Sequence, residues 1–320
     1  MDIFEKVRTS TKRVVESSKF VSWDLDKFKR LAEKLNPAEI KEFYKYDYYP
    51  YFIGREEELL NYIFTLNAMT FDFGLSSEFK TKRKRNDSSF YVVAFSLKKF
   101  VQQGKSLDAD FAKNVTKELI AQMLEVEPDF KLAEMYAKSL SELGKFIFEN
   151  YGTYSKFITE LNPKNRANEL VEVLFDNLSF YKDKTMYNGF DVYFLKRAQL
   201  LANDLYLAFK GEEYGEMGDI EKLTMFADNL VPHFFKVEGV LEYEESLENK
   251  IQKRIKLPFG SKEEVEIRSF GVQCVEEIKK ILVRDDPEIT SAQIDWYLWE
   301  KSQDTKYKSF PRHITETVFY

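Results

Sequence analysis

The stretch "GSKEEVEIRSFGVQCVEEIKKIL", residues 260–282, predicts a helix near the C-terminal end of the chain. After Gly260 it opens with a capping box formed by Ser261 and, three residues later, Glu264. In such a box each side chain bonds to the backbone N–H of the other residue, so the free donors of the first turn are satisfied. The pattern therefore marks a helix start and gives the chain one well-defined helical element.

Further helix signals lie on both sides of this stretch. Thr290 with Gln293 forms a second capping box at the start of "TSAQIDWYLWEKSQ". "NPAEIKEF" carries Asn36 as a cap and Pro37 in the first turn, the position where proline is tolerated best. Helices are also predicted over residues 1–18, 55–74 and 195–209 and, with stops at Gly104, Gly144 and Asn162-Pro163, over 90–180.

The composition favours long helices packed around bulky side chains. The 320 residues include 29 Phe and 19 Tyr but only 12 Gly and 8 Pro, so residues that break helices are few. One short β-hairpin is predicted over 184–194, where Asn188-Gly189 supplies a tight turn. Neither a repeat nor a linker is evident. The prediction is a mainly α fold in a single helical domain over residues 1–320.

The charge and the rare residues limit the function. A net charge of −6 argues against polymeric nucleic acid as the main partner, because phosphate contacts require a basic surplus. The basic run at 79–89 is interpreted as a solvated loop, with phosphate contact as the alternative. A single Cys and an N-terminus without a long apolar run suggest a cytoplasmic protein without a membrane span. Two His and no Gly-rich phosphate loop leave carboxylates as the expected catalytic groups, with no metal or cofactor.

The first candidate site residue is Asp228 in "LTMFADNLVPHFF", residues 223–235. Its neighbours are apolar, and a carboxylate that loses hydration has a raised pKa, as enzymes use for an acid, a base or a charge stabiliser. The alternative is a helix cap or turn residue before Pro232, since Asp is common at such boundaries. The residues alone favour this second interpretation.

A second group lies in "IDWYLWEK", where Asp295 and Trp299 are four residues apart and share a helix face, with Glu300 adjacent. An indole can stack on a flat heterocycle while the acids beside it accept the N–H groups of that heterocycle. The plainer interpretation, which the residues alone favour, leaves Asp295 and Glu300 in solvent.

Two further stretches are polar. Lys196, Gln199 and Asn203 form a stripe on an otherwise apolar helix, which is either a phosphate or sugar contact through Lys196 or simply a wet helix face. At the end of the chain, "FPRHITETVFY" places Arg312 and His313 before an aromatic terminus, and His313 is expected to be structural.

Several of these motifs, in order along the chain, resemble the queuosine salvage proteins. They are "NYIFTLNAMTFDFG", "LKRAQLLANDLY", "LTMFADNLVP", "VEIRSF", "IDWYLWE" and "FPRHITETVFY". The resemblance implies an all-α fold similar to helical DNA glycosylases. It also implies hydrolysis of the N-glycosidic bond of queuosine 5′-phosphate, which releases queuine, a 7-deazaguanine, for salvage into tRNA modification.

The same resemblance assigns roles to residues. The family's catalytic aspartate corresponds to Asp228 and its base-contacting phenylalanine to Phe226. The acid, aromatic and acid that bind queuine correspond to Asp295, Trp299 and Glu300.

The chain departs from the family pattern at a few positions that affect recognition. Asn229 and Leu230 replace a usual Tyr-Arg, and Gly74 stands where a Trp is common. Tyr51 takes the place of an expected histidine contact, and Trp299-Glu300 replaces a more usual Tyr-Asp pair. These changes leave open a related 7-deazapurine nucleotide or nucleoside as substrate.

The residues suit the implied chemistry. Cleavage of a C1′–N bond passes through a sugar cation, and a carboxylate such as Asp228 can stabilise that charge, bond to it or activate water. The expected partner is a small-molecule nucleotide, with water as the only co-substrate. The competing hypothesis is a non-catalytic helical protein that binds tRNA or a modified nucleoside through the 80–85 basic run and aromatic surfaces.

Overall fold

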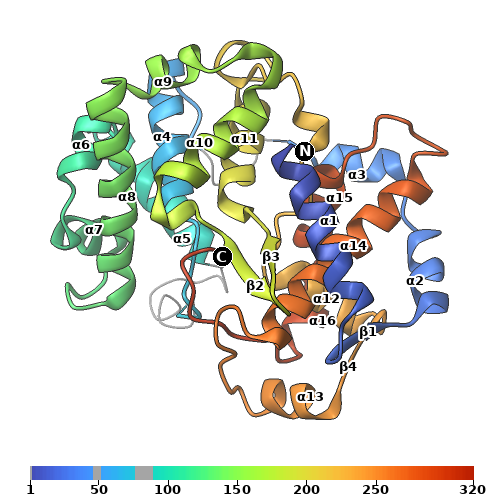
Figure 1. Cartoon of the computed structure of the whole chain (residues 1–320). Helices are drawn as coiled ribbons and strands as arrows, with labels where there is room; N and C mark the ends of the chain where they lie inside the picture. The colour runs from blue at the N-terminus through green and yellow to red at the C-terminus, as the bar shows by residue number, and fades with distance from the viewer. Residues whose placement is uncertain (1, 46–51, 76–88) are drawn as a thin grey trace. The chain divides into compact units, whose positions relative to one another are not determined.

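A computed structural model describes residues 2–45, 52–75 and 89–320. The chain is 62% helical, and its described strands form two antiparallel two-stranded sheets, so the predicted mainly α fold with a short hairpin is confirmed (Figure 1). It divides into two units. Unit 1 comprises residues 1–45, 183–196 and 221–316, and unit 2 comprises residues 46–182, 197–220 and 317–320. That the whole chain behaves as one domain stays a prediction, as does the similarity to DNA glycosylases.

Unit 1 contains both sheets and the C-terminal helices. Its helices are α1 (Ile3–Glu16), α2 (Leu25–Ala32), α3 (Pro37–Phe43), α12 (Leu230–Val237), α13 (Glu245–Gln252), α14 (Lys262–Leu282), α15 (Ser291–Lys301) and α16 (Thr305–Lys308). Its strands are β1 (Val21–Trp23), β2 (Lys184–Tyr187), β3 (Phe190–Tyr193) and β4 (Leu241–Tyr243), and the short 3-10 helix η5 (Ile220–Lys222) leads into its third segment.

Helix α14 is the central element of unit 1. It is buried on almost every side, and α1, α12 and α15 all pack against it (Figure 1). Helix α1 contributes the apolar stripe expected from its sequence, with Phe4, Val7 and Val14 fully buried and Val15 half-buried. A helix that is buried all round needs partners on several faces, which explains why segments from both ends of the sequence converge on α14.

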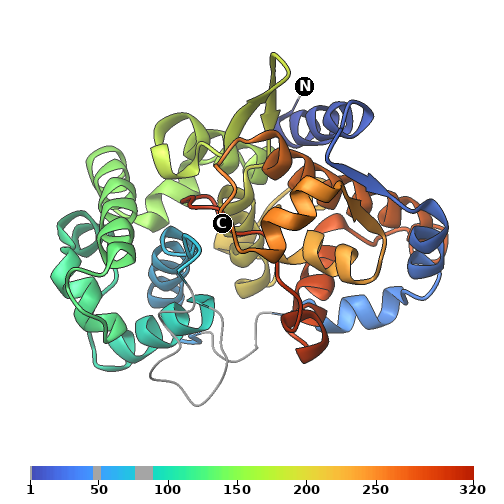
Figure 2. The same ribbon diagram turned by 90° about the horizontal axis from the view of Figure 1, so that it is seen from below.

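The two sheets of unit 1 are small. Strand β1 pairs with β4, which follows it by some 200 residues, in the register Val21↔Tyr243. Strands β2 and β3 form the hairpin predicted from sequence, and Figure 2 shows it beside α1. Asn188 and Gly189 both have positive φ, 47° and 87°, as a two-residue turn that matches strand twist requires.

The regular elements of unit 2 are all helices within its described residues. It contains α4 (Glu56–Ala68), α5 (Ser89–Gln102), α6 (Ala109–Asn114), α7 (Lys117–Leu124), α8 (Lys131–Asn150), α9 (Tyr154–Glu160), η2 (Pro163–Asn165), α10 (Arg166–Asn177), η3 (Ser179–Tyr181), α11 (Lys196–Ala208), whose first residue, Lys196, belongs to unit 1, and η4 (Glu213–Gly215). Helices α4, α6 and α7 all pack against α8.

The predicted helix boundaries need three corrections. The expected stop at Gly144 is wrong, because this glycine lies inside α8, where the lack of a side chain allows the backbone of α6 to approach. The helix expected over 55–74 ends at Ala68. There Arg197 donates to the carbonyl oxygens of Asn67 and Ala68 at 3.0 and 2.6 Å, in place of a further helical turn.

The third correction concerns the hydrogen bonds at the start of α14, where a capping box was predicted. The box of Thr290 and Gln293 is complete, as predicted. At α14 only half of the box forms: the Ser261 side chain accepts from the Glu264 N–H, but the Glu264 carboxylate turns to the N–H of Gly260 at 3.2 Å and to Arg268 at 3.3 Å. The caps of the helices at 36–43 and 290–303 and the helix at 195–209 are confirmed. Nearly all of the basic run at 79–89 lies outside the described residues.

Replacing Gly144 by Ala tests the contact between α6 and α8. A Cβ atom there would lie 2.2 Å from the backbone nitrogen of Lys113 and 2.5 Å from the carbonyl carbon of Ala112. Alanine favours a helix by about 1 kcal/mol over glycine, but overpacking costs about 1–3 kcal/mol or more. We expect Gly144→Ala to lose about 2 kcal/mol in urea unfolding. The exposed neighbour gives a control, Lys145→Ala, which should change little; a more stable Gly144→Ala would contradict the packing.

Candidate functional site

Asp228 lies at the end of a buried segment of unit 1. Residues 223–228 are all buried, and the Asp228 side chain is only 8% exposed. Its Oδ1 atom accepts the backbone N–H groups of Leu230 at 2.8 Å and Val231 at 3.4 Å, at the start of α12. The Asp228 carboxylate therefore caps α12, as the sequence favoured. This cap lies in an apolar environment and not in solvent.

Burial raises the pKa of Asp228 above its ordinary value, because the charged form loses its hydration. The positive charge of Lys196, the two backbone N–H groups and the positive charge of Arg312 partly oppose this rise in pKa. Lys196 is itself 91% buried, since only 9% of it is exposed, at the first residue of α11. The buried ammonium of Lys196 thus supplies a counter-charge for Asp228 that the local sequence did not reveal.

Asp295 lies close to Asp228, on the first turns of α15. Its side chain is 4% exposed, and its Oδ1 atom has no hydrogen-bond partner within the part of the chain that the structure describes. Burial raises the pKa of Asp295 well above the ordinary value, and the negative charge of Asp228 raises it further. Lys196 and a hydrogen bond from the Phe226 backbone pull that pKa down. The solvated position favoured for Asp295 on sequence grounds is therefore wrong.

Asp228 and Asp295 form a buried carboxyl pair with unequal proton affinities. Two carboxylates that share a site cannot both ionise easily, so the better-supported one ionises first. Asp228 has two backbone donors and two nearby cations, whereas Asp295 has an oxygen without a donor. Asp228 is therefore the acid that ionises first as pH rises, and Asp295 is the acid that keeps its proton to the higher pH. One charged and one protonated carboxyl is an arrangement suited to acid, base or electrostatic catalysis.

The other predicted site residues lie around this pair or on its helices. Phe226 is 4% exposed and bonds through its backbone to Asp295. Trp299 and Glu300 follow Asp295 on α15 and are both half-buried, and burial raises the pKa of Glu300. Tyr51 lies outside the described residues.

The polar stripe of α11 is not a wet helix face. Lys196, Gln199 and Asn203 are 9%, 0% and 0% exposed, so that alternative is wrong. His313 is also buried, and desolvation together with the charges of Arg268, Arg312 and His233 lowers its pKa to about 3. It is therefore neutral at physiological pH, as a structural histidine would be.

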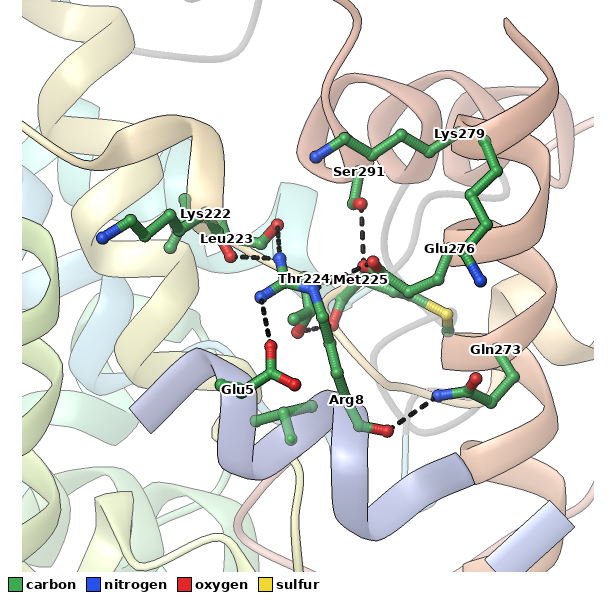
Figure 3. A network of polar contacts seen from close by, with 12 residues as sticks. Glu5, Arg8, Lys222, Leu223, Thr224, Met225, Gln273, Glu276, Lys279 and Ser291 are labelled. Carbon is green, nitrogen blue, oxygen red and sulfur yellow. Dashed lines mark hydrogen bonds and ion pairs between the residues drawn. The ribbon is translucent and has the colours of Figure 1, made fainter. Parts of the chain in front are cut away.

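The chain leading into Asp228 is held by a polar network at Arg8 of α1 (Figure 3). The Arg8 guanidinium donates to the carbonyl oxygens of Lys222 and Leu223, and its Nε pairs with Glu276 of α14 at 2.9 Å. Glu276 in turn accepts the hydroxyl of Ser291 at the start of α15 at 2.8 Å. The network thus joins α1, α14 and α15 to the segment that carries Phe226 and Asp228. Sequence analysis missed Arg8 and Glu276, because their partners lie far away in the sequence.

The raised pKa of Asp295 gives a test that needs no ligand. Between the ordinary pKa of an Asp and the raised one, only the folded protein holds the proton, so stability falls as pH rises. Asp295→Asn lacks this penalty. We therefore expect the unfolding free energy of Asp295→Asn minus that of the parent protein to rise with pH, by up to about 1.4 kcal/mol per pH unit.

The measurement is urea unfolding between about pH 5 and about pH 8. Asp286→Asn is the matched control, because the Lys41 ammonium, 2.6 Å away, lowers the pKa of Asp286. That contribution is lost only at pH values near or below the ordinary Asp pKa, so the control difference should stay flat across this range. A flat difference for Asp295→Asn as well would remove the assignment of the proton to Asp295.

Comparison with known proteins identifies the family. The family model described as queuosine salvage protein matches residues 51–320. The chain is 32% identical to the queuosine 5′-phosphate N-glycosylase/hydrolase of Sphaerobacter thermophilus over 98% of its own length and 97% of the relative's. It is also similar to the proteins of the same name from Dictyostelium discoideum (32% identity, 81% and 77% covered) and Bos taurus (28% identity, the full length of both). The chain belongs to the queuosine salvage protein family.

Proposed function

We propose that this protein hydrolyses the N-glycosidic bond of queuosine 5′-phosphate, or of a related 7-deazapurine nucleotide or nucleoside, and releases the free base. Membership of the family, with relatives named for this reaction, supports the substrate class. The observation that carries the mechanism is the buried pair of Asp228 and Asp295 next to the cation of Lys196. A solvated pair of acids would offer no comparable advantage to a charged transition state.

Asp228 is the proposed catalytic residue. As the C1′–N bond breaks, positive charge develops on the sugar, and a carboxylate in a low-dielectric environment attracts it more strongly than one in water. The bonds from Leu230 and Val231 fix Oδ1, which leaves Oδ2 as the atom to face the sugar. Water then forms the new C1′–O bond, either directly or after a covalent adduct with Asp228, and its proton balances the departing base.

Asp295 is the proposed recognition group for the base. An oxygen buried without a partner costs about 1–3 kcal/mol, and a donor-rich ligand would remove that cost. The ring N–H and exocyclic amine of a deazaguanine are such donors. Phe226 and Trp299 are the proposed aromatic contacts. Glu300 is the proposed partner of the cationic amine on the amino-cyclopentenediol arm that queuine carries.

Lys196 and Tyr51 remain proposed substrate contacts. Lys196 was chosen from sequence as a phosphate or sugar ligand, and its position near both carboxyls supports a place beside the reacting sugar. Its ammonium also lowers the pKa of Asp228, so it helps to keep that group ionised. The tRNA-binding alternative rests on the 80–85 basic run, which lies outside the described residues.

We also propose a cytoplasmic enzyme that acts on a small molecule rather than in a stable nucleic-acid complex. The net charge of −6 and the single Cys support this proposal. Among the described helices, none combines the length and the apolar character that crossing a bilayer requires.

The catalytic assignment predicts that Asp228→Asn abolishes base release. Asn keeps an oxygen that can accept the α12 N–H groups, so the fold should persist, but it lacks the charge that stabilises the sugar cation. We expect a loss of at least about a thousandfold in kcat, in line with the removal of a main electrostatic group. Incubation with queuosine 5′-phosphate and with queuosine, followed by mass spectrometry of free queuine, measures it. Asp286→Asn serves as the surface control, and turnover by a folded Asp228→Asn protein would refute the role.

The recognition assignment predicts weaker binding of the free base. Asp295→Ala removes the acceptor for the ring N–H and amine, so titration calorimetry with queuine should show about a tenfold loss of affinity, which corresponds to one hydrogen bond. Helix content, measured by circular dichroism, should stay the same. An unchanged affinity would contradict the assignment of Asp295 to the base.

A further inference from the structure

Arg268 of α14 is wholly buried and binds the residue next to Asp228. The side chain is 0% exposed, and its Nε donates to the carbonyl oxygen of Ala227 at 3.0 Å. Its two terminal nitrogens donate to both carboxylate oxygens of Asp183, Nη1 to Oδ1 at 3.1 Å and Nη2 to Oδ2 at 2.7 Å. The planar guanidinium therefore holds one backbone carbonyl and one carboxylate in a fixed relation, which a lysine could not do.

Asp183 extends this arrangement to Lys196. It is 2% exposed, and the same Oδ2 atom that binds Arg268 accepts the backbone N–H of Lys196 at 3.1 Å. That N–H belongs to the first residue of α11, where a carboxylate is favoured by the helix dipole. The backbone carbonyl of Asp183 also accepts the N–H of Phe194 at 3.1 Å, so the chain on both sides of the hairpin is tied to it.

The surroundings leave the guanidinium little room to move. The ring of Phe194 stacks on it with 3.9 Å between the guanidinium carbon and the ring centroid, and Glu264 accepts a further bond from Nη1 at 3.3 Å. Buried ion pairs are poor sources of net stability, since apolar residues of the same volume often do as well or better. The role of this pair is to hold two segments in place. Hydrogen bonds run from Ala227, next to Asp228, to Arg268, then to Asp183 and then to the backbone of Lys196.

We propose that Arg268 and Asp183 are positioning residues that fix Asp228 and Lys196 relative to each other for the reaction. Neither touches the substrate in this assignment. Arg268 acts through the carbonyl of Ala227 on the orientation of Asp228, and Asp183 acts through the backbone of Lys196. The inference rests on the proposed function, in which Asp228 carries the chemistry, but its structural part can be tested without substrate.

The first test is Arg268→Lys, which keeps the charge and removes the fork of donors. We expect kcat for queuosine 5′-phosphate to fall about a hundredfold, as a displacement of about 1 Å in a reacting group causes, while KM changes by less than about threefold. Asp183→Asn is the second variant, for the case in which a lysine is not tolerated in the core. It keeps one carbonyl oxygen as acceptor and should lower kcat in the same way.

Glu266→Gln is the matched control. Glu266 lies two residues from Arg268 on the same helix, is also 0% exposed and accepts three backbone N–H groups at residues 19–21. Within the described part of unit 1 its carboxylate bonds to residues 19–21 and to the Tyr187 hydroxyl, and to neither Ala227 nor Lys196. The Glu266→Gln variant should lower the melting temperature as much as Arg268→Lys does, yet its kcat should stay within about twofold of that of the parent protein. Equal losses of kcat in both variants would reduce Arg268 to a general structural role and overturn the proposal.

The second test follows the carboxyl groups themselves. Infrared difference spectra at stepped pH report the C=O band of a protonated carboxyl, and Asp228→Asn and Asp295→Asn assign it. The charged groups that act on Asp228 and Asp295 are Lys196 and Arg312, besides the two acids themselves. If Arg268→Lys lets Asp228 and Lys196 move apart, the pKa of Asp228 rises, and the acid limb of kcat against pH should shift upward with it.

The outcomes separate the two proposals. If the parent protein releases no base from either substrate, the proposed function fails, and the infrared titration alone decides the positioning role. If the parent is active and a folded Arg268→Lys variant keeps both its kcat and its carboxyl titration, the positioning role is wrong and the proposed function stands. A raised Asp228 pKa with reduced kcat supports both.

Discussion

Three charged side chains of α14, Glu264, Glu266 and Arg268, are completely buried, and unit 1 folds around the need to satisfy them. A buried charge without partners costs several kcal/mol, so each one requires donors or acceptors from elsewhere in the chain. Glu266 takes three backbone N–H groups at residues 19–21 and the hydroxyl of Tyr187. Arg268 takes Asp183 and the carbonyl of Ala227. One helix thereby fixes the turn after α1, the start of the hairpin and the segment before α12.

The carboxyl pair depends on this frame. Asp228 follows Ala227 directly, and Asp295 lies on α15, which packs against both α12 and α14. Because these elements bury the two acids together, the second to ionise experiences both desolvation and the charge of the first. In the proposed mechanism, the same burial that makes the site costly for stability strengthens its attraction for a cationic transition state.

Local signals predicted much of the fold. Caps at Asn36 and Thr290, the Asn188-Gly189 turn and the apolar stripe of the first helix depend on near neighbours in the sequence, and all were found as expected. The errors arose where distant segments intervene. Gly144 resembles a helix stop in sequence, but in α8 its missing side chain admits the backbone of α6. The helix from residue 55 ends early because Arg197 takes its last carbonyl groups.

The candidate site divides in the same way. The sequence by itself determined the helical class, the motifs that identify the family and the presence of a carboxylate among apolar neighbours at Asp228. Only the tertiary structure decided that Asp295 and Lys196 are buried near it, and that Arg268 and Asp183 hold the segments that carry it. The physical reason is range: caps, turns and periodicity act over a few residues, whereas desolvation and charge depend on partners such as Asp183 and Arg268, which are 85 positions apart in the chain.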